Sequence, residues 1–434
     1  MTQTLAPLQP TGLVSRLTAA YKERSKTERA VLLVIGALTV LAVARILADA
    51  NDLTSSGTVA ATLRVSAPLI CAGLAALWAE RVGIVNIGIE GMMILGTWFG
   101  AYGAWKFGPW VGLLVGIGGG MLGGLIHALA TIRFNVDHVI SGVAINILAG
   151  GATNFLSSQF FVGHQGGGLS QSPPQKAPIP SINLPVISGG EVFGWKSPDV
   201  AGWIERRHWF LVSDMASLIR GVTRDLSWAT LIVLALVPLS AWILWRTRFG
   251  LRLRSSGENP HAAASLGVSI PKVRYAGVAI SGALAGLGGA FLSIVAANIF
   301  REGQTGGQGF IGLATTIFGN WRPTGVLSGG ILFGFASALR LRADSNIPAL
   351  LLVVAMALTI LVVVVVRRRQ MIGGVVVLAC AGLAYLGYAV VEKIPQSLTS
   401  IAPHTITLIV LSTASQRLRP PAYAGMLYEA GEAH

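Results

Sequence analysis

The sequence predicts an all-α polytopic membrane protein with about twelve transmembrane helices. The chain has 434 residues, of which 53% are hydrophobic and only 12% are charged. That is about half the charged share of a soluble globular protein. Long apolar runs recur along the chain, and about 20 apolar residues are enough to cross the hydrocarbon core of a bilayer. A water-soluble enzyme of this size needs a charged exterior that this composition does not supply, so that class is excluded.

Eleven apolar runs reach or nearly reach the length of a membrane-spanning helix. They lie at 30–49, 58–80, 84–104, 109–132, 138–162, 228–246, 275–297, 324–342, 346–366, 371–391 and 398–416. A twelfth segment, 303–320, is shorter and glycine-rich, and either a full or a broken span fits it. We expect a full span, because basic residues then concentrate in the inside segments. Both termini are then cytoplasmic, and Arg340 with Arg342 is the one local violation.

These spans divide the chain into six segments. They are a cytoplasmic tail (1–29), a first transmembrane half (30–162), a long extracytoplasmic loop (163–227), a second transmembrane half (228–344) with a cytoplasmic loop at 246–274, an inserted helix pair (345–391), and a final helix with a cytoplasmic tail (392–434). In 163–227, apolar residues recur at helical spacing from Leu211 to Leu226 beside several arginines. This pattern predicts an interfacial helix. The pair at 345–391 carries almost no polar side chain, which suits contact with lipid.

Charge, cysteines and motifs exclude several other functions. The net charge of +14 does not indicate a nucleic-acid partner, because the basic residues lie between apolar runs, as loop charges do in membrane proteins. Cys71 and Cys380 lie far apart in apolar runs, so a disulfide framework is not expected. The chain has no P-loop motif and no paired histidine spacing. We therefore expect no catalytic residue, no metal and no cofactor in this chain.

The run from 80 to 93 holds Glu90, the only acidic residue deep inside a predicted span. Nearby glycines weaken the helix, and Asn86 lies four residues before Glu90, which places both on one helix face. An intramembrane charge is costly and marks function by default. Two interpretations stay open: a polar patch that lines a passage for a polar solute, or a structural carboxylate that hydrogen-bonds a neighbouring broken helix.

A second glycine-broken region is GQTGGQGFIG at 303–312. Glycine-interrupted segments in both halves of a transporter point to the solute path, whereas a flexible outside loop leading into a helix explains the same residues. Asn146 and Asn154 share one predicted span and either line the path or hydrogen-bond between helices. We expect His127 to be a packing or hydrogen-bonding residue rather than a proton carrier.

The cytoplasmic loop at 246–274 has the most specific pattern. Asn259 and Pro260 predict the start of a short helix, and Gly267 predicts its end. The positive-inside rule alone explains why an inside loop is basic. An ordered turn followed by a short helix and a terminating glycine is not explained by that rule, and it suits docking into a groove of another protein. We expect apolar docking through Ala263 and Leu266, with Arg252 and Arg254 beside them.

Two motifs carry a resemblance to a known family. NIGIEGMM at 86–93, and GLR at 250–252 followed by GENPHAAASLG at 257–267, resemble the paired signatures of bacterial ABC importer permeases. The branch is the one that includes the ribose and branched-chain amino-acid permeases, and the wording is most similar to its nucleoside or simple-sugar members. Gly309-Phe310, Gly319, Ile394-Pro395 and Pro403 also match, whereas His404 stands where relatives often have Tyr.

The resemblance implies a ten-helix type II-like core in each of two permease subunits, with an ATPase subunit that binds ATP and Mg. It also implies an extracytoplasmic substrate-binding lipoprotein and a multi-pass location in the bacterial plasma membrane. Removing the pair 345–391 leaves ten spans here. The expected pathway residues are Asn86, Gly88, Glu90, Gly91, Asn146, Gly309 and Phe310. The expected ATPase-coupling residues are Arg252, Glu258, Asn259, Pro260, Ala263, Leu266 and Gly267.

We therefore expect a permease that imports nucleosides, with a small polar solute, membrane lipid and the subunits above as partners. A permease for simple sugars such as ribose is one alternative. An ion-coupled secondary transporter is another, but such a carrier usually needs several intramembrane titratable groups. This sequence shows essentially one carboxylate of that kind.

Overall fold

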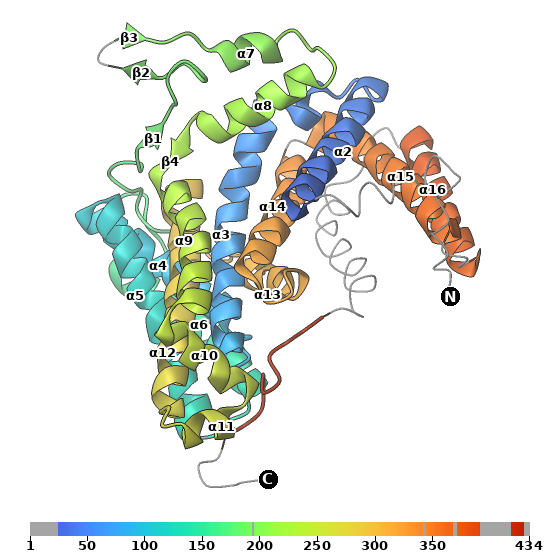
Figure 1. Ribbon diagram of the computed structural model, residues 1–434. Helices are drawn as coiled ribbons and strands as arrows, with labels where there is room; N and C mark the ends of the chain where they lie inside the picture. Colours follow the sequence, from blue (N-terminus) through green and yellow to red (C-terminus); the bar gives the residue numbers. More distant parts are fainter. Residues whose placement is uncertain (1–24, 193–194, 342, 368–370, 391–417, 429–434) are drawn as a thin grey trace, which may run out of the picture. The chain divides into compact units, whose positions relative to one another are not determined.

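A computed structural model describes residues 25–192, 195–341, 343–367, 371–390 and 418–428, and these residues are mostly helical (Figure 1). The chain divides into two compact units. Among the described residues, the larger unit comprises 55–192, 195–203, 217–341, 343 and 418–428, and the smaller unit comprises 25–54, 204–216, 344–367 and 371–390. Most of the predicted spans correspond to helices of the larger unit, and the candidate site residues lie there too.

The larger unit is a bundle around α3. Its helices are α3 (Ser56–Arg81), α4 (Ile89–Phe107), α5 (Pro109–Ala128), α6 (His138–Phe160), α9 (Trp228–Arg246), α10 (Arg248–Glu258), α11 (Pro260–Ser265), α12 (Ile270–Phe291), α13 (Gln308–Phe318) and α14 (Pro323–Leu341). The π-helical turns Leu129–Arg133 and Leu292–Ala296 extend α5 and α12. Helix α3 packs against α9, α12, α13 and α14, and α12 also packs against α4 and α5. The core therefore lies along α3 and α12.

Glycines allow α5 and α12 to approach each other closely. A Cβ added to Gly120 would lie 2.3 Å from the Cα of Gly286, and one added to Gly124 would lie 3.0 Å from the Cα of Gly282. Small residues four apart let helix backbones meet in membranes, where the hydrophobic effect does not drive helices together. This contact fixes α12 against the first half of the chain.

The segment from 163 to 227 holds short strands and two helices. Strand β1 (Ser181–Ile182) pairs antiparallel with β4 (Leu226–Ser227), and β2 (Glu191–Val192) pairs antiparallel with β3 (Trp195–Lys196). Helix α7 spans Val200–Glu205, and α8 spans Val212–Thr223. The helix predicted from the apolar spacing is therefore confirmed as α8, and its interfacial role stays a prediction. The two strand pairs were not predicted, because two-residue strands leave no periodicity to detect.

The smaller unit contains α2 (Lys26–Leu47), the 3₁₀ turn Asn51–Thr54, and most of α15 (Ala343–Arg367) and α16 (Met371–Val390). Arg45 lies within a predicted span, and its Nε is 3.4 Å from Asp214 Oδ1. Both side chains are buried, at 4% and 0% exposure. Thr54 also donates a hydrogen bond to Asp214 Oδ1 at 2.5 Å. The charge of Arg45 is thus neutralised locally, as burial requires.

Within the described residues, six helices are long and apolar enough to cross a membrane. They are Ser56–Arg81, Pro109–Arg133, His138–Phe160, Trp228–Arg246, Ile270–Ala296 and Gly373–Val390. Helix α13 has 11 residues, about 17 Å at 1.5 Å per residue, which is too short to cross alone. The predicted span 398–416 lies outside the described residues, so the count of twelve stays a prediction. The chain is a multi-pass helical membrane protein.

Candidate functional site

The segment between α3 and α4 is a turn rather than a helix. Helix α3 ends at Arg81, and α4 begins at Ile89 with Gly88 as its N-cap. Gly83 has a φ of +93°, a conformation that residues with a Cβ rarely adopt. The expectation that Asn86 and Glu90 share one helix face is therefore wrong, because Asn86 precedes the helix. The expected span 84–104 begins at Ile89 for the same reason.

Glu90 joins the beginning of α4 to the beginning of α13. Its side chain is buried, with 8% exposure. Oε1 accepts the backbone N–H of Gly307 at 2.9 Å, and Oε2 accepts that of Gly309 at 2.7 Å. The first N–H groups of a helix lack partners within the helix, and its N-terminus favours negative charge. The geometry matches a carboxylate that hydrogen-bonds a neighbouring broken helix, and a role in the solute path stays a prediction.

Gly309 packs directly against Glu90. A Cβ added to Gly309 would lie 2.6 Å from both the Cα and the N of Glu90, closer than real Cβ atoms approach. Gly307, the N-cap of α13, has a φ of +79°. This junction of Glu90, Gly307 and Gly309, called the Glu90 junction below, therefore needs glycine at both α13 positions.

Asn146 on α6 holds the other side of the same turn. Its Oδ1 accepts the backbone N–H of Gly91 at 2.7 Å, and its Nδ2 donates to the carbonyl of Ile87 at 3.1 Å. A Cβ added to Gly91 would lie 2.7 Å from the carbonyl oxygen of Ile145. Asn146 therefore makes the interhelical hydrogen bonds that one of its two interpretations predicted. Asn154 of the same helix donates to Glu302 Oε1 at 2.9 Å.

Asn86 and His127 are also held by hydrogen bonds. The Asn86 side chain is fully buried, and its Nδ2 donates to Ser281 Oγ on α12 at 3.0 Å. His127 lies between Ser141 Oγ, 2.9 Å from Nδ1, and the carbonyl of Val85, 3.2 Å from Nε2. His127 is thus a hydrogen-bonding residue, as expected. These contacts hold two adjacent residues of the turn, Val85 and Asn86.

Buried polar atoms without a hydrogen-bond partner lie close to the junction in sequence. Within the described residues they include Gln304 Nε2 and Gln308 Oε1, and also Asn86 Oδ1. Phe310, in the first turn of α13, is 47% exposed. Buried polar groups are normally paired, so a free amide donor and a free amide acceptor suit a polar ligand. The sequence pattern singles out the glycines of 303–312 but not Gln304 and Gln308, although two amides in a glycine-rich membrane segment were the available signal.

The predicted docking loop is confirmed in its local structure. Asn259 caps α11, because its Oδ1 accepts the backbone N–H of Ala262 at 2.9 Å. Pro260 is the first residue of that helix, and Gly267 follows its end with a φ of +80°. Thr247 caps α10 in the same way, accepting from Gly250 at 3.0 Å. We call residues 247–267 the coupling loop, after the role that the resemblance predicts for it.

The exposed face of the coupling loop differs from the expected one. Leu266 is 85% exposed, whereas Ala263 is buried at 3%. Arg254 is directed into this chain, since its Nε donates to the carbonyl of Leu244 at 2.8 Å and its guanidinium lies 5.4 Å from the Trp245 ring centre. Arg252 is exposed. Of the two residues expected to dock, only Leu266 is exposed, because Ala263 is covered by its own chain; docking itself stays a prediction.

Residues 418–428 tie the coupling loop to the turn before α4. The backbone N–H of Tyr423 donates to the carbonyl of Gly257 at 2.8 Å, and that of Gly425 donates to the carbonyl of Gly83 at 3.0 Å. Glu258 lies 3.6 Å from Arg81 Nη1, and its side chain is 53% exposed. Hydrogen bonds therefore connect the coupling loop, through residues 418–428, to the segment that leads to Glu90.

Comparisons with known proteins agree on one family. The family model described as "Branched-chain amino acid transport system / permease component" matches residues 58–363. The guanosine ABC transporter permease protein NupQ of Bacillus subtilis is 38% identical over 289 residues, which cover 65% of this chain and 81% of that protein. The nucleoside ABC transporter permease protein NupC of Lactococcus lactis is 32% identical over 377 residues, covering 85% and 96%.

A putative glucose ABC transporter permease protein, TsgC13 of Haloferax volcanii, is 32% identical over 295 residues, which cover 67% of this chain and 79% of that protein. No solved structure matches this chain. The matched region contains the Glu90 junction and the whole coupling loop.

Proposed function

The chain belongs to the family of permease components of branched-chain amino acid transport systems, and we propose that it carries nucleosides. As a permease subunit of an ABC transporter it is a transport component rather than an enzyme, and it acts with ATPase and substrate-binding partners. Hydrolysis of ATP, with its Mg, belongs to the partner ATPase. Two relatives whose names specify nucleosides or guanosine support the choice of solute.

The main support for the proposed solute path is the Glu90 junction. It brings together two glycine-broken segments, one from each half of the chain, and such segments form solute sites in transporters. The pathway residues are Asn86, Gly88, Glu90, Gly91, Asn146, Gly309 and Phe310, now with Gln304 and Gln308. Hydrogen bonds hold Glu90 and Asn146 in place, so these two shape the path.

The chemistry near the junction suits a nucleoside. Gln304 Nε2 is a free donor and Gln308 Oε1 is a free acceptor within the described residues, which fits a solute with hydroxyl and ring nitrogen groups. The exposed ring of Phe310 offers a flat apolar surface to a nucleobase. A few placed polar groups beside an aromatic side chain are typical of small-molecule sites.

The remaining parts of the assembly follow from the proposed topology. We place twelve spans in the bacterial plasma membrane, as a ten-helix core plus the pair 345–391, with both termini cytoplasmic; 303–320 is then a broken span, of which only α13 is helical. The coupling loop then faces the ATPase through its exposed residues Leu266, Arg252, Glu258, Asn259 and Gly267, whereas Pro260 is buried like Ala263 and acts by starting α11. A second permease subunit and an extracytoplasmic binding lipoprotein complete the importer.

Uptake by liposomes that contain the permease, its ATPase and its binding protein tests this function. We expect uptake of labelled guanosine or adenosine that requires ATP on the ATPase side and is unaffected by collapsing proton and sodium gradients. Excess unlabelled nucleoside should compete, and excess ribose or glucose should not. Uptake driven by an ion gradient without ATP overturns the proposal of an ATP-driven importer. Competition by ribose or glucose but not by nucleosides would show that the transported solute is a sugar, in line with the relative named as a glucose permease.

A further inference from the structure

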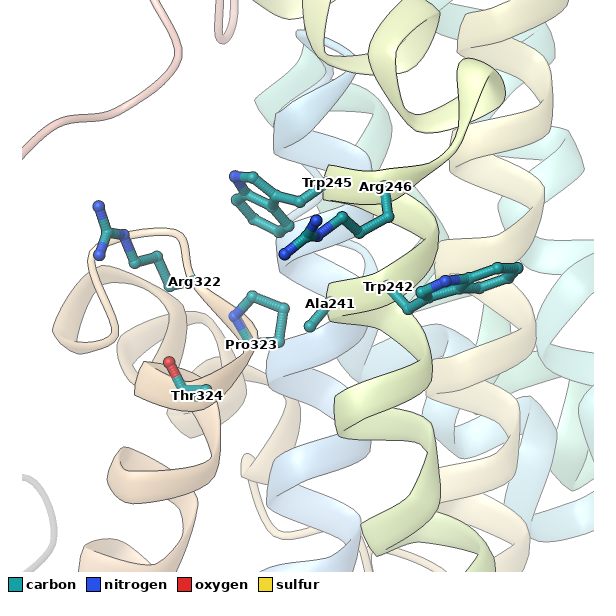
Figure 2. A pocket seen from close by; sticks show the side chains of 7 residues that line it. All are labelled: Ala241, Trp242, Trp245, Arg246, Arg322, Pro323 and Thr324. Atoms are coloured by element: carbon teal, nitrogen blue, oxygen red, sulfur yellow. The ribbon is translucent and has the colours of Figure 1, made fainter. Parts of the chain in front are cut away.

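A pocket of about 560 Å³ lies between the end of α9 and the start of α14. Its lining residues are Ala241, Trp242, Trp245, Arg246, Arg322, Pro323 and Thr324. Figure 2 shows Arg246 and Trp245 on α9 and Arg322 at the start of α14, with Ala241 and Pro323 between them. Trp242 is 59% exposed and Trp245 is 36% exposed, and both arginines are exposed. The pocket thus combines two cations with two accessible indoles.

Positive charge around this pocket exceeds negative charge. Arg81 and Arg254 both lie over the Trp245 ring, at 5.3 and 5.4 Å from its centre. Arg254 and Arg322 each repel Arg81 electrostatically. The nearby carboxylates are engaged, because Glu258 pairs with Arg81 and Glu80 accepts a hydrogen bond from the indole of Trp321. None of the described residues that line the pocket is acidic, so the cluster attracts an anion.

The position of the pocket at the membrane surface indicates which kind of anion binds there. Arg246 is the last residue of α9, and Arg322 directly precedes α14, so both lie at helix ends. Tryptophan gathers at membrane–water interfaces, and arginine gathers on the cytoplasmic side. Basic pockets between transmembrane helices on that side bind anionic lipid headgroups. In the proposed topology, these two helix ends face the inner leaflet.

We propose that this pocket binds an anionic phospholipid of the inner leaflet. Its phosphate lies between Arg246 and Arg322, and its glycerol and acyl groups lie along Ala241 and Pro323, which Figure 2 shows between α9 and the start of α14. A lipid seated there also neutralises charge next to Trp245, which Arg254 of the coupling loop contacts. The site is distinct from the solute path and does not depend on which solute is carried; only its assignment to the inner leaflet rests on the proposed topology.

Native mass spectrometry of the purified permease, mixed with phosphatidylglycerol, cardiolipin or phosphatidylcholine, tests this site. We expect the two anionic lipids to bind and phosphatidylcholine to bind at least tenfold more weakly. The double variant Arg246→Gln/Arg322→Gln should bind the anionic lipids about 25-fold more weakly, at about fivefold for each arginine. Arg246→Lys/Arg322→Lys, which keeps both charges, should retain most binding.

The matched control is Arg133→Gln/Arg301→Gln, which removes two exposed arginines of the larger unit that do not line the pocket and should bind lipid like the unchanged protein. Equal lipid binding by the Arg246→Gln/Arg322→Gln variant and this control overturns the proposal, as does equal binding of phosphatidylcholine. Inorganic phosphate at millimolar concentration should not displace the lipid, because it gains no contact with the apolar part of the lining. Displacement of the lipid by inorganic phosphate would show that the pocket binds free phosphate rather than a lipid, and would overturn the proposal. Nucleoside uptake in the same variants is measured separately, so failure of the importer function is distinguished from failure of this site.

Discussion

The Glu90 junction and the coupling loop are built in opposite ways. Glu90 accepts from residues 217 and 219 positions away in the chain, and its side chain is buried. Asn259 accepts from the backbone N–H of Ala262, only three residues away, and Leu266 at the end of that helix is 85% exposed. The junction is therefore complete within this chain, whereas the loop presents an apolar side chain that is uncovered here.

This difference predicts different failures. Changes at the junction should impair solute movement while the loop keeps its shape, because the caps of α10 and α11 come from Thr247 and Asn259 within the loop itself. Changes on the exposed side of the loop should impair ATPase docking while the junction stays intact. Four substitutions test the comparison, from the largest expected effect to the smallest.

Gly309→Ala should have the largest effect. Its Cβ would meet the Glu90 backbone at 2.6 Å, and overpacking of this kind costs about 1–3 kcal/mol. We expect nucleoside uptake per inserted permease to fall by about a hundredfold, measured in liposomes with the assembled complex. The control is Gly118→Ala on α5, where an added Cβ meets nothing within 4 Å. Equal uptake by the two variants would show that α13 does not need its close contact with Glu90.

Glu90→Gln should have the next largest effect. Both carboxylate oxygens accept backbone N–H groups, but an amide offers only one acceptor oxygen and turns its NH₂ toward the other donor. A buried donor left without a partner costs about 1–3 kcal/mol, so uptake should fall about 30-fold at normal membrane levels. Glu28→Gln, at an exposed residue of α2, is the control. Unchanged uptake would limit Glu90 to a replaceable hydrogen-bonding group.

Leu266→Asp should weaken ATPase binding about tenfold. Full burial of a leucine contributes about 1.5–3 kcal/mol, and the substituted carboxylate cannot enter an apolar groove. The measurement is co-purification of the ATPase with the permease, followed by substrate-stimulated ATP hydrolysis. Leu169→Asp changes a leucine that is 60% exposed in the 163–227 segment and should leave ATPase binding unaltered. Full ATPase binding by the Leu266→Asp variant would show that this loop does not couple the permease to the ATPase.

Asn259→Ala should have the smallest effect of the four. It removes the side-chain acceptor for Ala262 N–H, and such a cap is worth about 1 kcal/mol. ATP hydrolysis stimulated by the loaded binding protein should fall about fivefold. Asn259→Ser, which retains a capping oxygen, should restore most of the stimulation. If the Ala and Ser variants behave alike, the order of α11 does not depend on its cap.

The sequence predicted the coupling loop well because its signals are local. Asn259, Pro260 and Gly267 start and stop a helix through backbone geometry and short-range hydrogen bonds. The same signals did not show that Ala263 is buried, since burial depends on distant segments that pack against the loop. Helix positions were also predicted closely in the larger unit, because long apolar runs define them.

The Glu90 junction was only partly predictable. Composition marked Glu90 and the glycines of 303–312 as unusual, but pairing between them is a tertiary contact that no spacing rule encodes. The glycines near residue 86 predict a weakened helix and a turn is found there, so the four-residue spacing of Asn86 and Glu90 does not place them on one helix face. Arg45 and Asp214 give a similar case, since neither residue's surroundings in sequence point to the other.

The separation of the two regions is tested most directly by assaying Glu90→Gln and Leu266→Asp side by side in the complete importer. In each variant, ATPase occupancy on the permease and nucleoside uptake are both measured. We expect Glu90→Gln to hold a full complement of ATPase while its uptake falls about 30-fold, and Leu266→Asp to lose ATPase about tenfold with uptake falling in proportion. Loss of ATPase in the Glu90 variant, or full ATPase occupancy with impaired uptake in the Leu266 variant, would contradict the assignment of solute path and coupling to these two regions.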